Sequence, residues 1–293
     1  MESAESPTLD PDGCGGGMGR SKEYEDLYRN RPLVEGYPAL DELERRQVLG
    51  RAHHSETDCA WTVTYLTRLL VEPVNGGSAL VVGCGSRPEI LLALHRSGFH
   101  AVGIEPVPSL AAEARTFLEG RGSVAEGSAE SLPVDDASQR LVLLESVLEH
   151  VDSPEKALAE AYRVLGAGGI AYITTTNRLQ LRNSEYRMRF FQWLPPVLKE
   201  AYIHQHLHFN PSLGNFTTRP AVHWFSYSDL CKLGRSAGFY RFYSKVDVVR
   251  RDDPPIACSA LRRFALRWAQ TRPLVRALAL TQNAGGTVYM VKR

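Results

Sequence analysis

Short apolar runs alternate with longer amphipathic stretches along the middle of the chain. The apolar runs predict buried strands, and they cover residues 78–83, 100–104, 123–126, 140–145 and 169–176. The amphipathic stretches between them predict helices, and they cover residues 88–96, 109–118 and 153–165. Strands joined by helices of this length run parallel, because such crossovers are right-handed and place helices on both faces of one sheet.

The same kind of pattern continues on either side of this region. Three further helices and then two further strands are expected, over residues 57–71, 226–237, 258–282, 239–249 and 286–292. Pro273 should interrupt the helix over 258–282, because proline lacks the backbone donor that a helix interior needs. The sequence therefore predicts an α/β fold with a seven-stranded, mostly parallel sheet.

The start of the chain and one internal segment break the strand–helix rhythm. Residues 1–20 are rich in Gly, Ser, Pro and acidic residues, which is typical of a disordered leader. Residues 21–293 are expected to form a single domain. Two segments, at about 22–71 and 178–222, are expected to form a cap on this domain. Insertions of such length in a compact domain usually serve a function.

The second cap segment is unusually aromatic. Its large apolar side chains are Tyr186, Phe190, Phe191, Trp193 and Leu194. With the helix that carries Trp61, they predict a lid that excludes water from a largely apolar binding site. The alternative interpretation is that these side chains form only the lid's own core.

Composition narrows the functional classes. The formal charge of +1 gives no long-range field for nucleic acid. No apolar run approaches the roughly 20 residues of a membrane-spanning helix. The five cysteines lack a CxxC spacing, which argues against a disulfide framework or a structural zinc site. We expect a cytoplasmic protein that acts on a small molecule, in an oligomeric state that the sequence leaves open.

A glycine turn follows the first predicted strand. Gly83, Cys84 and Gly85 can bend the chain sharply and let its backbone approach a ligand closely. Glu105 ends the second strand about 20 residues later, where an acidic side chain can accept both hydroxyls of a ribose. Nicotinamide enzymes share these two features, so further motifs must distinguish the classes.

Three further segments carry a family resemblance. They are Gly-Ser-Ala-Glu-Ser-Leu-Pro at 127–133, Leu-Val-Leu-Leu-Glu-Ser-Val-Leu-Glu-His-Val at 141–151 and Arg-Val-Leu-Gly-Ala-Gly-Gly at 163–169. With the glycine turn they resemble, in order and spacing, the motifs of class I S-adenosylmethionine-dependent methyltransferases. The similarity spans 78–177, with a weaker echo at 223–239, and is greatest to the small-molecule branch (quinone, glycan and natural-product enzymes). It implies a Rossmann-like fold and disfavours a nicotinamide oxidoreductase.

The resemblance implies S-adenosylmethionine as the cofactor and assigns contacts to it. The residues concerned are Gly83, Cys84, Gly85, Glu105, Pro106, Ser128, Ala129, Glu145 and Ser146. Three positions depart from the family pattern: Val81 and Ser128 stand where acids are common, and Arg87 replaces a third glycine. Arg87 could pair with the cofactor carboxylate, project into solvent or crowd the site.

The acceptor side is less defined. Methyl transfer to oxygen needs a base, and His150, which follows the fourth strand, is the candidate, with a packing role at the next helix start as the alternative. Trp61, Asn177 and His223 are predicted to bind substrate. Quinone-type relatives bind a divalent metal through Glu-x-x-Glu-His, but Ser146 occupies the first position here, so no metal site is expected.

Two clusters keep several interpretations open. His204, His206 and His208 alternate, and could bind a metal, contact an acidic substrate or simply be solvated. Arginines concentrate in the last predicted helix, at 262, 263, 267, 272 and 276. They predict a solvated basic face, with peripheral contact to an anionic membrane as the alternative.

These observations lead to one functional hypothesis and one alternative from another class. The first is methyl transfer from S-adenosylmethionine to a small-molecule acceptor, by O-methylation of a glycan, quinone-like or natural-product substrate. The alternative is a catalytically silent or repurposed protein with the same fold. Val81 and Arg87 favour the alternative, whereas Glu105 and the strand-end motifs favour the enzyme.

Overall fold

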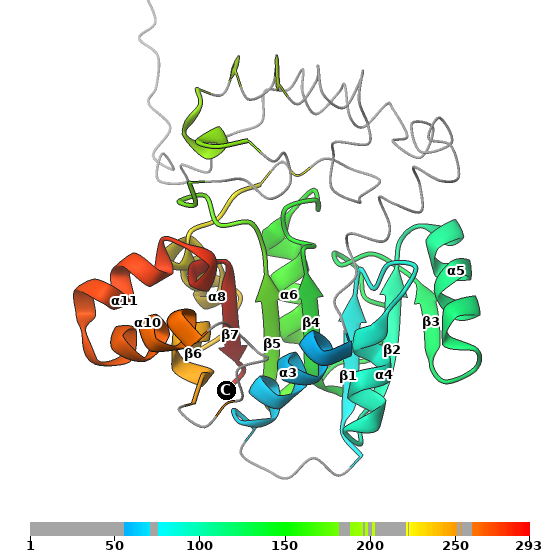
Figure 1. Ribbon diagram of the computed structural model, residues 1–293. Helices are drawn as coiled ribbons and strands as arrows, with labels where there is room; N and C mark the ends of the chain where they lie inside the picture. Colours follow the sequence, from blue (N-terminus) through cyan, green and yellow to red (C-terminus); the bar gives the residue numbers. More distant parts are fainter. Residues whose placement is uncertain are drawn as a thin grey trace, which may run out of the picture.

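A computed structural model describes most of the chain from residue 56 onward, and its centre is one mixed sheet (Figure 1). The described residues are 56–70, 76–181, 188–195, 197–198, 201–202, 221, 223–250, 253 and 260–293. The strands are β1 (Ser78–Val82), β2 (His100–Glu105), β3 (Ser123–Glu126), β4 (Gln139–Glu145), β5 (Leu165–Thr174), β6 (Arg241–Ser244) and β7 (Thr287–Val291). The predicted leader at 1–20 and the first 34 residues of the first cap lie outside the described residues.

The sheet has the order β3-β2-β1-β4-β5-β7-β6, which confirms the predicted seven-stranded α/β fold. Strands β1 to β5 run parallel to one another, and β7 runs antiparallel between β5 and β6. From β1 the chain adds β2 and β3 towards one edge of the sheet, and it then returns to add β4 and β5 on the other side of β1. The carboxyl ends of β1 and β4 therefore form the topological switch point, where α/β sheets bind their ligands.

Helices cover both faces of the sheet. They are α3 (Glu56–Thr67), α4 (Glu89–Arg96), α5 (Pro108–Leu118), α6 (Pro154–Val164), α8 (Tyr227–Ser236), α9 (Lys245–Val248), α10 (Ala260–Thr271) and α11 (Pro273–Leu280), with short 3-10 turns at Phe191–Trp193 and Asn283–Gly286. In Figure 1, α3 and α4 lie in front of the sheet, and α6 and α8 lie behind it.

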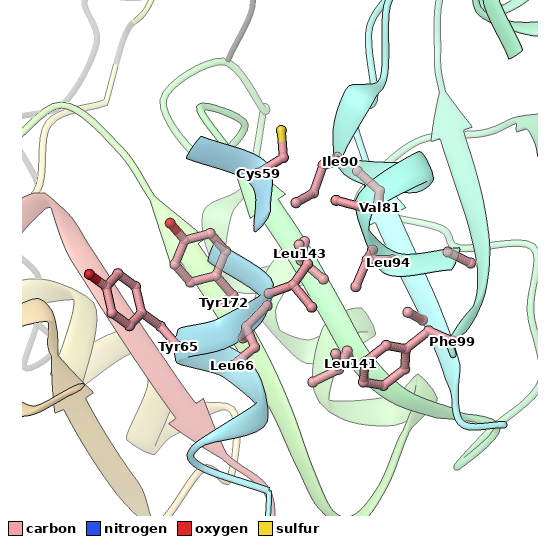
Figure 2. Packing of buried hydrophobic residues seen from close by; sticks show 14 of the residues in the cluster. Cys59, Tyr65, Leu66, Val81, Ile90, Leu94, Phe99, Leu141, Leu143 and Tyr172 are labelled. Carbon is pink, nitrogen blue, oxygen red and sulfur yellow. The ribbon is translucent and has the colours of Figure 1, made fainter. Parts of the chain in front are cut away.

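The hydrophobic core has two layers, because successive residues of a strand point to opposite faces. Val81, Leu143 and Tyr172 pack on the face covered by α3 and α4, together with Cys59 and Leu66 of α3 (Figure 2). Their sequence neighbours pack on the other face, under α6 and α8; these are Val82, Leu144 and Ile173. The buried, continuous apolar strands of the sequence follow from this double coverage.

Local sequence signals explain where the helices begin. Ser153 caps α6 by accepting a hydrogen bond from the Lys156 N–H, and Pro154 occupies the first turn, where no donor is needed. Ser226 and Asp229 form a capping box at the start of α8. Pro273 separates α10 from α11, as predicted.

The strand predicted over 239–249 was wrong in its second half. Strand β6 ends at Ser244, and the short helix α9 follows it. The Asp247 side chain accepts hydrogen bonds from the backbone and the hydroxyl of Ser244, which forms a second capping box. This Ser-x-x-Asp signal outweighs the strand preference of the two valines in α9.

No helix of the described residues is long and apolar enough to cross a membrane.

Candidate functional site

The turn after β1 exposes backbone at the switch point. Gly83 and Gly85 both have a φ of 65°, a left-handed conformation that favours glycine. The N–H groups of Gly83 and Cys84 both donate to the Ile104 carbonyl, which holds the turn against β2. A Cβ at Gly83 would lie 2.7 Å from Cγ2 of Val147, whereas a Cβ at Gly85 would meet no described atom within 4 Å. The backbone at Gly85 is therefore open to a ligand.

The Glu105 carboxylate lies at this open turn. Its side chain comes from the end of β2 and the residue is only 4% exposed. Oε2 accepts a hydrogen bond from the Gly85 N–H at 2.9 Å, and Oε1 accepts one from the Val107 N–H at 3.2 Å. Burial raises the pKa of Glu105, and these two N–H groups oppose that rise. Each oxygen keeps lone-pair capacity for a further donor, so the group fits the two hydroxyls of a ribose.

Cys84 and Arg87 flank the turn in different ways. The Cys84 sulfur packs against Gly103 of β2, where a Cβ would come within 2.8 Å of it. Burial, assisted by the Glu105 charge, raises the pKa of the Cys84 thiol to about 12, so it stays protonated at neutral pH. The Arg87 guanidinium is about half exposed and lies over the Phe117 ring of α5, 5.3 Å from its centre. This cation–π contact gives Arg87 a partner in the protein itself.

The residues predicted to meet the adenine lie on two neighbouring loops. Pro106 follows Glu105 directly and is exposed. Ser128 and Ala129 belong to the loop after β3, where Ser128 bridges to Ser131 and Ala129 is buried. Because the Gly127 N–H donates to the Glu105 carbonyl, this loop begins beside the carboxylate. The structure thus brings the predicted cofactor residues of β2 and β3 to one edge of the sheet.

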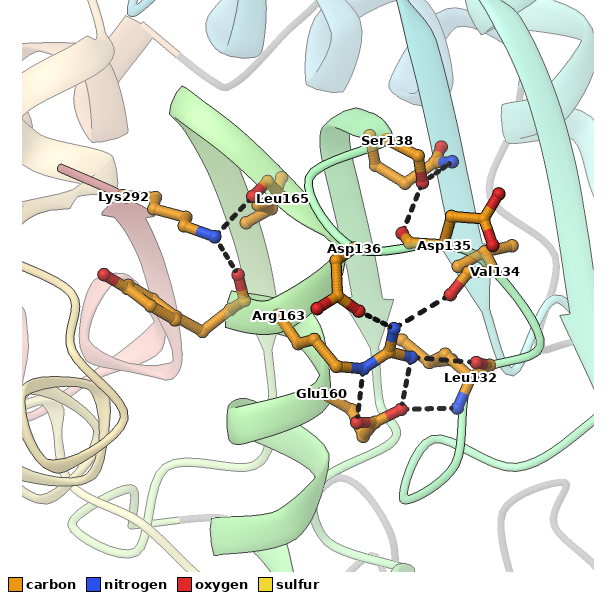
Figure 3. Close-up of polar contacts among 11 residues, drawn as sticks. Leu132, Val134, Asp135, Asp136, Ser138, Glu160, Arg163, Leu165 and Lys292 are labelled. Carbon is orange, nitrogen blue, oxygen red and sulfur yellow. Dashed lines mark hydrogen bonds and ion pairs between the residues drawn. The ribbon is translucent and has the colours of Figure 1, made fainter.

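Arg163 of α6 holds the loop after β3 in place (Figure 3). Its guanidinium donates to both carboxylate oxygens of Glu160, at 2.8 Å each, and to the carbonyls of Leu132 and Val134. It also pairs with Asp136 at 2.6 Å. Glu160 in turn accepts from the Leu132 N–H. Such forked, charge-assisted contacts fix geometry as well as energy, so Arg163 is a positioning residue that sequence reasoning missed.

Strand β4 ends in a strained backbone. Glu145 pairs with Thr174 of β5, and the Ser146 N–H donates to the carbonyl of the same threonine. Ser146 has a φ of 53°, a conformation that non-glycine residues seldom adopt, and it is exposed. Strain of this kind tends to occur at functional sites, and the resemblance had placed Glu145 and Ser146 at the cofactor.

Glu149 is the most unusual group near this end of the sheet. Its side chain is fully buried, and burial raises its pKa to about 7. Polar groups of Thr175, Thr176 and Ser146 oppose the rise, so the carboxyl is poised between its neutral and ionised forms near neutral pH. Glu149 was not among the predicted site residues. The available signal was its position directly before His150 in the motif after β4.

The two predicted histidines lie in, or are hydrogen-bonded to, the turn that carries Glu149. His150 is in the turn after β4, half-buried, with its Nε2 atom buried. His223 is tied to the same turn, because its N–H donates to the Glu149 carbonyl and its Nε2 lies 3.1 Å from the Val151 carbonyl oxygen. The segment around His223, which follows the predicted lid, is thereby fastened to the loop that carries His150.

Asn177 and Trp61, both predicted to bind substrate, lie on different elements of the fold. Asn177 is fully buried, and its amide nitrogen donates to the carbonyls of Leu280 and Gln282 while its oxygen accepts from the Leu179 N–H. These bonds join the segment after β5 to the end of α11, and the substrate role of Asn177 stays a prediction. Trp61 is half-buried on α3 and contacts the Tyr65 ring at 5.7 Å between centroids. Its substrate role stays a prediction.

The described part of the lid has a small aromatic core. Phe191 is fully buried against Tyr202 and Trp224, with ring centroids 5.7 and 5.8 Å away. Phe190 and Trp193 are 50% and 62% exposed. The aromatic residues thus divide between a local core and an exposed surface. Tyr186, His204, His206 and His208 lie outside the described residues. Within the described ranges, no three His, Cys, Asp or Glu side chains gather where they could hold a metal.

Comparison with known proteins finds one family whose pattern matches part of this chain. Residues 80–173 match the family described as "Methyltransferase domain". The matched region begins in β1 and ends in β5, so it contains the glycine turn, Glu105, the Arg163 contacts and the turn after β4. The matched family and the sheet geometry therefore agree on the same part of the chain.

Two curated relatives match part of this chain. An uncharacterised methyltransferase of Mycobacterium ulcerans (strain Agy99) is 34% identical over 106 residues, which are 36% of this chain and 41% of that protein. A ubiquinone biosynthesis O-methyltransferase of Azorhizobium caulinodans is 31% identical over 140 residues, which are 43% of this chain and 51% of that protein. The chain spans about half the length of these relatives or less.

Solved structures share the fold over a larger part of the chain. A putative methyltransferase of Haloferax volcanii, solved with the activator Trm112, is similar with a TM-score of 0.50 and 19% identity, covering 86% of this chain and 98% of that one. The cyclase SpnF gives a TM-score of 0.50 and 18% identity, covering 92% and 96%. At such identities the likeness concerns the fold alone.

Proposed function

We propose that this chain carries a class I methyltransferase domain whose cofactor is S-adenosylmethionine, and that it transfers the methyl group of this cofactor to a small-molecule acceptor. The observation that carries the proposal is the buried Glu105 carboxylate, held by the N–H groups of Gly85 and Val107 beside an open glycine turn. This arrangement suits a ribose on the carboxylate and the methionine part of the cofactor along Gly85.

The roles of the protein groups follow from the reaction. The bound cofactor would supply an electrophilic methyl group, so the protein needs to align an acceptor atom, exclude water and remove a proton. Gly85 and Glu105 would bind and orient the cofactor. His150 would take the proton from an acceptor hydroxyl, since it lies in the turn after β4 near the expected position of the methyl group. His223, fastened to the same turn, would keep that turn in place.

An oxygen acceptor on an aromatic or otherwise apolar small molecule is the substrate class that we favour. The aromatic residues Phe190 and Trp193 of the lid support it, because they are 50% and 62% exposed and flat apolar surfaces suit such substrates. The named activity of the Azorhizobium relative, ubiquinone biosynthesis O-methylation, supports the same class.

A second candidate is a protein of this fold that binds the cofactor without transferring its methyl group. Two observations favour it. Val81 of β1 is buried in the apolar layer under α3 and α4, and it has no carboxylate in place of the acid that the resemblance leads us to expect there. The cyclase SpnF, whose fold this chain shares, bears the name of a different reaction.

A transfer assay separates the two candidates. The purified protein would be incubated with tritium-labelled S-adenosylmethionine and a panel of phenols, catechols, sugars and amines. We expect label to appear in a phenolic or quinol product. His150→Ala should lower kcat about 100-fold, the usual size of a lost general base. His223→Ala should lower it much less, because that side chain acts through the turn.

The outcomes of this assay are distinct. Transfer to a panel member that His150→Ala abolishes supports the enzyme with His150 as its base. Transfer that survives His150→Ala rejects that role and leaves the methyltransferase in place. Tight cofactor binding without transfer to any acceptor favours the second candidate.

A further inference from the structure

The net charge of the chain is near neutral, but its acidic and basic residues are unevenly distributed along the sequence. Residues 254–293 contain seven of the 34 Lys and Arg residues and none of the 33 Asp and Glu residues. The preceding part of the chain therefore has an excess of acidic residues. Helices α10 and α11 lie in this basic stretch and form the flank of the molecule opposite α5 (Figure 1).

Large apolar side chains project from both helices of this flank. Phe264 and Trp268 are one turn apart on α10 and are 65% and 53% exposed. Leu274 and Leu278 are one turn apart on α11 and are 86% and 65% exposed. Residues four apart lie on the same side of a helix, so each helix presents an apolar pair. We call these four side chains, with Arg267 and Arg272, the docking face.

The orientation of α10 is fixed by its other side. Ala269 is buried in the core, and the Gln270 amide donates to the carbonyls of Val246 and Val249 at 2.8 Å. On α11, Arg276 pairs with Asp247 through two hydrogen bonds. These contacts hold the inner sides of the helices against α9, so the docking face is a stable feature of the fold.

Two arginines on this face have no acidic partner among the described residues. Arg267 and Arg272 are exposed on α10 and just after it. By contrast, Arg276 is neutralised by Asp247, and the Lys292 ammonium donates to the carbonyls of Tyr162 and Leu165. The exposed charge of the flank is therefore positive and lies next to aromatic and aliphatic side chains.

We propose that the docking face binds the surface of an anionic phospholipid bilayer. Tryptophan and phenylalanine beside arginine are suited to the boundary between headgroups and acyl chains, and the two leucines can enter the apolar layer. The positive charge complements anionic headgroups. A nucleic acid would satisfy the arginines but would leave Leu274 and Leu278 in water, and a second copy of this face would bring like charges together.

The docking face is connected to the proposed active site. Asn177, at the end of β5, donates hydrogen bonds to the carbonyls of Leu280 at the end of α11 and of Gln282 just beyond it. The carboxyl edge of the sheet is thus joined directly to the helix that would lie on the membrane. A protein bound in this way would hold its acceptor side beside a lipid surface, where apolar acceptors concentrate.

Vesicle co-sedimentation of the full chain tests the proposal without requiring methyl transfer. The probes are vesicles of phosphatidylcholine alone and vesicles that also contain phosphatidylglycerol. We expect binding only to the anionic vesicles, weakened by salt. R267Q/R272Q should weaken binding about 25-fold, or about five-fold for each charge. F264S/W268S and L274S/L278S should each weaken it at least as much.

Matched variants on other surfaces serve as controls. Arg121→Gln removes an exposed charge after α5, and Tyr240→Ser removes an exposed aromatic ring before β6. Both should bind vesicles as the wild type does. The proposal is overturned if anionic vesicles do not sediment the wild type, or if the docking-face variants bind as well as the controls. It is also overturned if F264S/W268S converts a dimer to a monomer in sedimentation velocity while vesicle binding is absent, or if only a DNA duplex binds.

Discussion

The cofactor side and the acceptor side of this sheet are built in different ways. On the cofactor side, the Glu105 carboxylate is held by backbone N–H groups of Gly85 and Val107, which lie 20 and two residues away in the chain. On the acceptor side, Glu149 is buried by groups from distant segments, including Thr175 and Thr176 after β5, and its backbone binds His223.

This difference explains why one side can be deduced from motifs and the other cannot. A site made of glycines, one acid and backbone donors needs only a short stretch of sequence to define it. A site that depends on side chains from 146–150, 175–176 and 223–225 is defined only once the chain has folded. The following predictions test this contrast, from the largest expected effect to the smallest.

Alanine at the two turn glycines should lower the free energy of unfolding by different amounts. Gly83→Ala combines a left-handed φ with a 2.7 Å approach to Val147 and should cost about 4 kcal/mol of unfolding free energy. Gly85→Ala has the same φ but open space around it, so it should cost about 1 kcal/mol. Urea unfolding measures both. Equal costs would contradict the assigned contact with Val147.

Glu149 should make the stability of the acceptor side depend on pH. Its folded pKa of about 7 lies above the ordinary value of 4.5, so between these values the folded protein binds more protons than the unfolded chain. Stability should therefore fall as pH rises through this window, by about 3 kcal/mol in total, and the loss should be complete above pH 7. Below pH 4.5 the Glu149 carboxyl is protonated in both the folded and the unfolded chain, so its ionisation costs no stability there.

The variant Glu149→Gln isolates this effect, because it keeps the shape of the side chain and removes its ionisation. We expect thermal unfolding of the wild type and the variant to converge near pH 5 and to separate towards pH 8, with the variant more stable there. A constant difference across this range would show that Glu149 does not titrate in the folded protein.

Arg163 links α6 to the cofactor side and should have a moderate effect. Arg163→Ala removes the fork on Glu160 and leaves the carbonyls of Leu132 and Val134 without their donor, for a cost of about 2 kcal/mol. Cofactor affinity should also fall, since the loop with Ser128 and Ala129 loosens. Arg163→Lys, which keeps the charge but lacks the planar fork, should recover less than half of the loss in urea unfolding.

Arg87 should have the smallest effect. Its guanidinium is engaged with Phe117, so Arg87→Ala should change stability within about 0.5 kcal/mol and leave cofactor affinity nearly unchanged. Calorimetric titration with S-adenosylhomocysteine provides the measurement. Tighter binding by the variant would show that Arg87 crowds the site, and much weaker binding would show that it pairs with the cofactor carboxylate.

The fold and the cofactor side could be predicted from the sequence because their signals are local. Apolar runs defined the strands, and the spacing between Gly83 and Glu105 defined the acid at the end of β2. The roles of Asn177 and Glu149 could not be predicted, since they depend on α11 and on the segment around His223, which are distant in the chain. The contacts of Arg163 to the loop after β3 were missed because Leu132 and Val134 accept through their backbone carbonyls, which leave no trace in side-chain patterns.

The most direct test of the cofactor site compares two acids on neighbouring strands. Glu105 and Glu126 are register partners on β2 and β3, but Glu105 is buried at the turn whereas Glu126 is exposed beside Arg115. Calorimetric titration with S-adenosylhomocysteine would be made on the wild type, Glu105→Gln and Glu126→Gln, after thermal unfolding has established that all three are folded. We predict binding by the wild type and Glu126→Gln, and a loss of about 100-fold in Glu105→Gln, the size expected for two hydrogen bonds to a charged group. Equal affinity in Glu105→Gln and the wild type, or no binding by the wild type, would contradict the assignment of this site.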